Sequence, residues 1–147
     1  MLTVIVETGR AAERLPALLT ALTSAAVDGL VRQVILVGGE PAELMALLRE
    51  ETGAELAPEL GTAIAAAKAE LLLFAPGEFR PRAGWTAALA RELRSGARQA
   101  IIVGEGGGFF RRAPVAVLTP RSRAEALAHP DLKRLRGQLG RAVPRLG

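Results

Sequence analysis

Four glutamates follow closely on short apolar runs that have the composition of buried β-strands: Glu7, Glu40, Glu78 and Glu105. If those runs lie parallel in one sheet, their carboxyl ends meet at the edge where such sheets bind ligands. A carboxylate placed there can act as a general acid or base; the alternative is that each glutamate solvates a turn or caps a helix. The loops in which we look for chemistry are 7–10, 38–40, 75–78 and 104–108.

Other reactive groups are sparse in the chain. There is no cysteine, which excludes thiolate nucleophiles and cysteine-based metal sites. The one histidine, His129, has no His or Cys partner and precedes Pro130, so a place at a helix entry explains it better than a ligand role. The glycine run 104–108 has Phe109 where a dinucleotide fingerprint needs its third glycine, and no phosphate-binding Gly-Lys-Ser/Thr motif occurs.

Alternating strand and helix patterns must position these loops. Continuous apolar runs predict strands buried on both faces, as in a parallel sheet, at 2–6, 33–37, 71–74 and 100–103. Helical spacing predicts helices at 15–22, 41–48, 62–69, 82–94, 122–128 and 131–139. Shorter strand pieces are expected at 53–56, 109–110 and 115–118. The pattern is typical of a three-layer α/β/α fold with a mostly parallel sheet, in one domain spanning residues 1–147.

The composition indicates a globular protein with an aliphatic core, because 50% of the residues are hydrophobic but only 3% are aromatic. No basic leader precedes Glu7 and no 18-residue apolar span fits, so we expect a soluble, cytoplasmic protein. Residues 1–78 carry five Lys/Arg and eleven Asp/Glu, whereas residues 79–147 carry fourteen and four. This asymmetry can steer anionic partners to one face, or it can serve solubility alone.

A series of segments resembles the nucleotide-binding half of family 2 glycosyltransferases. It consists of Val4–Thr8, Leu15–Leu22, Gln33–Gly39, Gly61–Ala67, Glu70–Phe74 and Gly84-Trp85. Spacing and order both match. The similarity covers residues 1–94, whereas residues 95–147 form a reduced, basic C-terminal part. The resemblance implies the GT-A (nucleotide-diphospho-sugar transferase) fold, a nucleoside diphosphate sugar as ligand, and a divalent metal that bridges the two phosphates.

The chain departs from the family at its ligand-binding positions. Gly38 stands where the family has an Asp that contacts the base, and Pro76-Gly77-Glu78 stands where it has the Asp-x-Asp motif that holds ribose and metal. Glu7 replaces the usual proline after the first strand. One carboxylate therefore replaces two, which weakens the case for Mg²⁺ or Mn²⁺ without abolishing it, because Mg²⁺ commonly uses one or two carboxylates plus phosphate oxygens and water.

Three hypotheses follow. In the first, a compact glycosyltransferase-like enzyme holds the metal with Glu78, lines the nucleoside pocket with Thr8, Gly38 and Gly39, and contacts the diphosphate with an arginine, Arg80 or Arg82. In the second, the chain is a catalytically degenerate binding or interaction module with the same fold. In the third, the basic tail docks on an anionic membrane surface, with nucleic acid as the less favoured partner.

The C-terminal segment is expected to pack as an amphipathic helix. Leu132, Leu135 and Leu139 fall on one stripe of the helix predicted over 131–139. The stripe should pack on the domain or on a second copy of the chain, which leaves a homo-oligomer open. Lys133, Arg134 and Arg136 are expected to face solvent.

Overall fold

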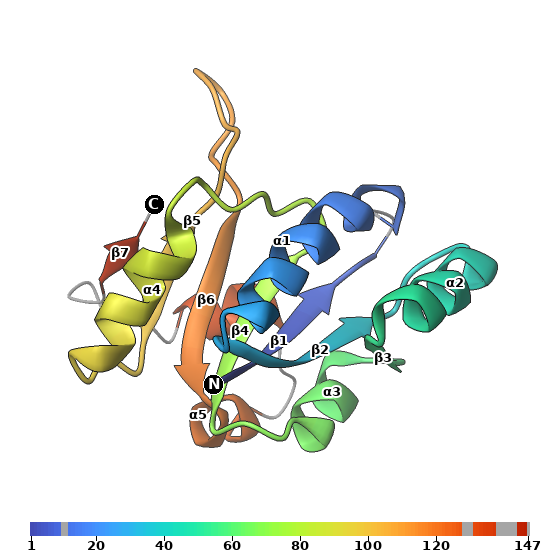
Figure 1. Ribbon diagram of the computed structural model, residues 1–147, viewed down its shortest axis with the longest axis horizontal. Coiled ribbons are helices and arrows are strands. Elements are labelled where there is room, and N and C mark those ends of the chain that lie inside the picture. The colour runs from blue at the N-terminus through green and yellow to red at the C-terminus, as the bar shows by residue number, and fades with distance from the viewer. Residues whose placement is uncertain (10–11, 128–130, 138–143, 147) are drawn as a thin grey trace.

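Seven strands form one sheet in the computed structural model, which describes residues 1–9, 12–127, 131–137 and 144–146 (Figure 1). The strands are β1 (Leu2–Glu7), β2 (Val31–Val37), β3 (Glu55–Ala57), β4 (Leu71–Pro76), β5 (Ala100–Val103), β6 (Val115–Pro120) and β7 (Arg145–Leu146). Their order is β3-β2-β1-β4-β6-β5-β7. Only β6 pairs antiparallel, with β4 and β5. The mostly parallel sheet predicted from the continuous apolar runs is confirmed.

Helices cover both faces of this sheet. They are α1 (Leu15–Val27), α2 (Ala42–Thr52), α3 (Leu60–Ala66), α4 (Trp85–Arg94), α5 (Arg121–Glu125) and α6 (Leu132–Gly137), with a 3₁₀ turn, η1 (Ala12–Arg14), before α1. Side chains of α1, α2 and α4 pack into one buried cluster, and side chains of α3, α5 and α6 pack into a second. Strand β1 supplies Val4 and Val6 to the first cluster and Ile5 to the second, as its alternation dictates. The result is a three-layer α/β/α arrangement.

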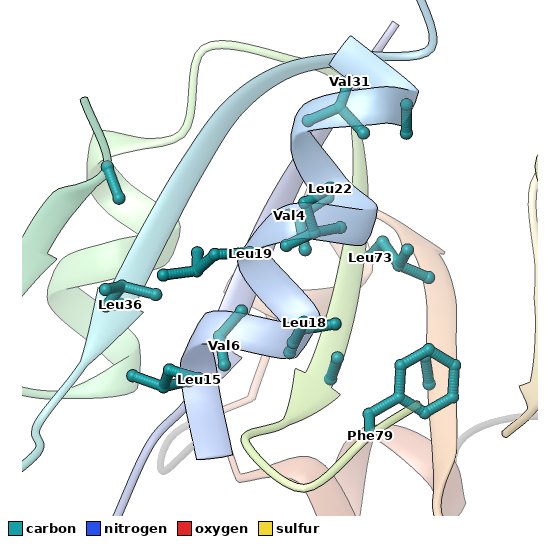
Figure 2. Close-up of a cluster of buried hydrophobic side chains, with 14 of the residues drawn as sticks. Val4, Val6, Leu15, Leu18, Leu19, Leu22, Val31, Leu36, Leu73 and Phe79 are labelled. Carbon is teal, nitrogen blue, oxygen red and sulfur yellow. The ribbon is translucent and has the colours of Figure 1, made fainter. Parts of the chain in front are cut away.

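The larger cluster joins α1 to the centre of the sheet. Figure 2 shows Leu15, Leu18, Leu19 and Leu22 of α1 over β1, with Phe79 at one side of the cluster. Leu18 is fully buried and Leu22 is 3% exposed. These leucines recur at the i, i+3, i+4, i+7 spacing that predicts such a face, so this helix follows directly from the sequence.

A buried polar network joins the strands at the edge of the sheet where the parallel strands begin. The Thr3 hydroxyl donates to Gln33 Oε1 at 2.8 Å and accepts from the Ala69 amide at 3.2 Å. Gln33 Oε1 also accepts from the Lys68 amide at 2.8 Å, and Gln33 Nε2 donates to Glu55 and to a backbone carbonyl. The network secures the chain where it enters β4, far from the carboxyl-terminal loops.

Several predicted boundaries and one predicted strand piece differ from the structure. Phe109 and Phe110, expected as a strand piece, lie instead at the tip of a turn closed by mutual backbone hydrogen bonds between Gly108 and Arg111. Helix α4 begins at Trp85 rather than at residue 82, and α3 covers 60–66 rather than 62–69.

The C-terminal part adds an element that no sequence pattern predicted. Strand β7 pairs parallel with β5 through Arg145 and Leu146. Helix α6 ends at Gly137, and the rest of the predicted helix, with Leu139, lies outside the described residues, as does His129. Leu135 is buried as predicted, at 1% exposure. Lys133 and Arg134 are exposed, whereas Arg136 is half-buried. Within the described part of the chain, no helix is long and apolar enough to cross a membrane.

Candidate functional site

The carboxyl ends of β1 and β4 lie side by side and continue their pairing into the loops that follow. The Gly77 amide donates to the Glu7 carbonyl at 3.0 Å, and the Thr8 amide donates to the Val37 carbonyl of β2 at 3.0 Å. The backbone therefore sets the segment Glu7-Thr8 directly beside Gly77-Glu78. The sequence predicts that these two loops lie together, and the hydrogen bonding that continues from β1 and β4 brings them side by side.

A tight turn after β4 presents Glu78. The Phe79 amide donates to the Pro76 carbonyl at 3.0 Å, which closes the turn, and the Phe79 ring is buried at 2% exposure in the cluster under α1 (Figure 2). Pro76 ends the strand because it cannot donate to a ladder. With Phe79 anchored below and Pro76 behind, Glu78 is left exposed at the outer side of the turn.

Contacts with the start of the next loop hold this turn in place. The Glu105 amide donates to the Arg80 carbonyl at 2.6 Å, and Arg82 Nε donates to the Gly104 carbonyl at 3.1 Å. Gly104 is required at this crossing, because a Cβ there would come within 2.9 Å of both the Arg80 carbonyl oxygen and the Phe79 ring. The loops that follow β4 and β5 are thus locked together.

An open hollow of about 450 Å³ lies at this edge. Its lining residues are Glu7, Thr8, Gly9, Glu13, Arg14, Pro76 and Glu78. A second hollow of about 430 Å³ shares Arg14 and Glu78 with the first and extends along Glu105, Gly106, Gly107, Arg111, Arg112 and Pro114. One end of this combined groove is rich in carboxylates and the other in guanidinium groups.

Negative charge is crowded at the acidic end. Burial raises the pKa of Glu7 above its ordinary value, and the nearby charges of Asp131 and Glu78 raise this pKa further. Asp131 Oδ1 also accepts from the Arg134 amide at 2.7 Å, which caps the start of α6. Asp131 Oδ2 also pairs with Arg134 Nε at 3.4 Å, so its charge is partly balanced. The charge of Glu7 is therefore disfavoured here, a condition that a bound cation or proton relieves.

A buried hydroxyl without a partner adjoins these carboxylates. Thr8 is 2% exposed, and in the described structure its Oγ1 has no hydrogen-bonding partner. Such an orphaned group is costly in a folded protein unless something else satisfies it. Thr8 is also one of the residues that line the hollow.

The predicted site residues in the strand-end loops do not all line the same hollow. Thr8 and Glu78 line the same hollow. Gly38 and Gly39 lie at the end of β2, at the same sheet edge, but are not among the residues that line this hollow. Of the four strand-end glutamates, Glu40 likewise lines neither hollow.

Two predicted site residues, both arginines, donate hydrogen bonds to backbone carbonyls around the site. Arg80 donates to the carbonyl oxygens of Arg14, Gly77 and Phe79, and Arg82 donates to that of Gly104. Both guanidinium groups therefore brace the turn that presents Glu78. Their predicted contact with a diphosphate stays a prediction.

The structure also adds residues that sequence reasoning had not assigned to binding. Arg14 lines both hollows and Glu13 lines the first. Both precede α1 and follow the loop 7–10 at the carboxyl end of β1, where the sequence predicts ligand binding. Asp131 could not have been found, because no local pattern connects it to Glu7.

The residues at this edge suit a divalent metal only in part. Across the described ranges, no three His, Cys, Asp or Glu side chains gather closely enough to hold a metal ion by themselves. The pair Glu7 and Glu78, whose charges disfavour each other, does suit a cation that takes its other ligands from phosphate oxygens and water. The described residues do not form a closed metal site.

Comparisons with known proteins are consistent with this fold. No family model and no curated protein matches the sequence. Among solved structures, Rv0371c of Mycobacterium tuberculosis H37Rv in complex with manganese shares 21% identity at a TM-score of 0.59, over 99% of this chain and 86% of that one. Glucosyl-3-phosphoglycerate synthase of M. tuberculosis in complex with Mn²⁺, UDP and phosphoglyceric acid shares 16% identity at a TM-score of 0.60, over 99% and 68%.

A third structure widens the range of enzymes with this architecture. 4-Diphosphocytidyl-2C-methyl-D-erythritol synthase of Anaerococcus prevotii shares 9% identity at a TM-score of 0.55, over 99% of this chain and 87% of that one. At these identities the likeness concerns the fold. The chain therefore has an α/β fold like that of GT-A nucleotide-sugar transferases.

Proposed function

We propose that this chain binds a nucleoside diphosphate sugar, together with a divalent cation, in the hollow at the carboxyl ends of β1 and β4. The observation that carries the proposal is the meeting of Glu7, Thr8 and Glu78 at one wall of that hollow. The fold supports it, because structures of similar architecture hold Mn²⁺ and UDP. The resemblance to family 2 glycosyltransferases supports the same ligand class.

Each residue has a role in this proposal that suits its chemistry. Glu78, with Glu7 beside it, would hold Mg²⁺ or Mn²⁺, which when bound neutralises charge on the diphosphate. The unpaired Thr8 hydroxyl bonds a polar atom of the ligand. Arg14, in the wall of both hollows, contacts phosphate oxygens through its guanidinium fork. Gly38 and Gly39, which directly follow β2 and carry no side chain, leave space for the nucleoside at this edge of the sheet.

A catalytically degenerate module is the second candidate. Two points support it: the resemblance places a single carboxylate, Glu78, where the family has its Asp-x-Asp motif, and the described residues hold no three-ligand group. Such a module binds a nucleotide sugar without transferring the sugar.

Titration calorimetry with UDP- and GDP-sugars, with and without Mn²⁺, tests binding. We expect metal-dependent affinity that is lost in Glu78→Gln, because the substitution removes the charge and keeps the shape. Glu50→Gln is the matched control, since Glu50 is exposed on α2 away from the hollow. Unchanged affinity in Glu78→Gln rejects Glu78 as a ligand, and no affinity in the unaltered protein rejects the proposal.

A second measurement separates the two candidates once binding is established. Release of the nucleoside diphosphate from the bound donor is followed with time in the presence of Mn²⁺, with water or the hydroxyl group of an added acceptor taking the glycosyl group. Turnover that disappears in Glu78→Gln favours the enzyme, whereas tight binding without release favours the degenerate module.

A further inference from the structure

A hairpin of residues 104–114, here the Phe-Phe hairpin, leaves the sheet between β5 and β6 and projects away from the body of the molecule (Figure 1). Its base is closed by the Gly104 amide, which donates to the Pro114 carbonyl at 2.8 Å. Its tip is closed by the Gly108 amide, which donates to the Arg111 carbonyl at 2.8 Å, with the reciprocal bond at 3.3 Å. The two residues between Gly108 and Arg111 therefore stand at a defined end.

Those two residues are phenylalanines that lie almost wholly in solvent. Phe109 is 98% exposed and Phe110 is 94% exposed, and their rings meet edge to face with centroids 5.0 Å apart. The chain has only four phenylalanines, and the other two, Phe74 and Phe79, are buried at 1% and 2% exposure. Half of the phenylalanines of this protein are thus held in water, an arrangement that folding alone does not favour.

Positive charge directly follows the rings. Arg111 and Arg112 are exposed, and Arg14 lies at the base of the hairpin, where Glu105 is the opposing acidic group. Long arginine side chains can keep their charge at a polar boundary while neighbouring rings enter an apolar layer. The order of two aromatic residues and then two arginines therefore matches the interfacial zone of a membrane that carries anionic headgroups.

The small size of the tip favours a lipid surface over a protein partner. Two phenylalanine rings offer roughly 400 Å² of apolar surface in total. A stable protein–protein interface takes about 800 Å² from each partner. A fluid bilayer closes around a convex tip of any shape, so it can bury both rings fully without a matching pocket.

We propose that the Phe-Phe hairpin docks this protein on anionic membranes: Phe109 and Phe110 enter the interfacial layer, and Arg111 and Arg112 contact acidic headgroups. The proposal concerns a different segment from the basic C-terminal tail and does not depend on nucleotide binding. It does set the groove beside Arg14 and Glu78 close to the headgroup layer, because the base of the hairpin lines that groove.

Co-sedimentation of the full chain with vesicles tests the proposal, using phosphatidylcholine with phosphatidylserine and phosphatidylcholine alone. We expect binding to the mixed vesicles that falls at least about tenfold in Phe109→Ala/Phe110→Ala. The matched control is Val27→Ala/Leu47→Ala, which removes apolar side chains that are 83% and 48% exposed elsewhere and should bind like the unaltered protein.

A second pair of variants tests the charge. Arg111→Gln/Arg112→Gln should lower binding to the mixed vesicles by about tenfold, whereas Arg32→Gln/Arg49→Gln, exposed on β2 and α2, should not. Equal losses in hairpin and control variants, or no binding by the unaltered protein, overturn the proposal. A sedimentation coefficient that falls in Phe109→Ala/Phe110→Ala without vesicles shows an interface between copies and also overturns it.

Discussion

Replacing Thr8 by valine separates the stability of the free protein from its capacity to bind a ligand. Valine keeps the shape of threonine and removes the buried Oγ1, which has no partner in the described structure. An unpaired buried hydroxyl costs about 1–3 kcal/mol in proteins. We therefore expect Thr8→Val to raise the free energy of unfolding by about 1 kcal/mol or more, and to weaken nucleotide-sugar binding at the same time.

Two other buried threonines provide the controls for Thr8. Thr3 is fully buried with its hydroxyl paired to Gln33 and to a backbone amide, so Thr3→Val should lower stability by about 1–3 kcal/mol. Thr119 is 1% exposed and its Oγ1 has no partner in the described structure, but it lies at the amino-terminal edge of the sheet. Thr119→Val should stabilise without any effect on binding.

Urea denaturation of the ligand-free proteins measures all three changes. For a chain of this size, 1 kcal/mol corresponds to a shift in Tm of about 2–4 °C, which a thermal scan resolves. If Thr8→Val destabilises the protein as much as Thr3→Val does, the Thr8 hydroxyl is satisfied in the free protein and the reasoning fails. If Thr8→Val stabilises the protein but leaves ligand affinity unchanged, the hydroxyl makes no contact with the ligand.

The remaining predictions concern backbone space, tail packing and pH. Gly104→Ala should destabilise by about 1–3 kcal/mol in urea denaturation, because its Cβ meets Phe79 and a carbonyl, whereas Gly61→Ala, with open space in helix α3, should be neutral or stabilising. Leu135→Ala should cost about 2–5 kcal/mol because Leu135 is 1% exposed; a smaller loss would show that α6 packs loosely. The pKa of Glu7 is raised above its ordinary value of 4.5 in the folded state. The contribution of Glu7 to the free energy of unfolding is therefore most favourable below pH 4.5 and is lost as the pH rises through the folded-state pKa. Glu7→Gln should therefore raise Tm at neutral pH but not in acid, and an equal gain at both would refute the linkage.

The central strands and their loops could be predicted from sequence because local composition dictates them. The run Leu71–Phe74 is apolar throughout, as in a strand covered on both faces, and it is short and followed by Pro76-Gly77, which favours a strand over a helix. Glu78 then follows at the carboxyl end of the strand, where parallel sheets bind ligands. This part of the site needed only the strand pattern and the rule for sheet edges.

The rest of the site depends on contacts that no local pattern encodes. Asp131 approaches Glu7 because α6 packs against β4 and β6, a long-range arrangement that the sequence does not announce. The Phe109-Phe110 pair has the composition of a strand, but Gly106 and Gly107, with φ of 100° and 87°, turn the chain out of the sheet before it. Local propensity was overruled there by backbone geometry.

The single antiparallel strand has a consequence for how the chain folds as it is made. The first 76 residues contain strands β1, β2, β3 and β4. The pairing of β1 with β4, which begins at Leu2 and Leu71, can form only after β4 has been synthesised. A nascent chain of that length exposes β4 as a bare edge, and such edges recruit other chains. Strand β6 arrives later and covers it through the pairs from Leu71 with Pro120 to Phe74 with Val117. Ribosome-bound intermediates that stop before β6 should therefore be the species most prone to aggregate, and the hairpin that delivers β6 decides how long that exposure lasts.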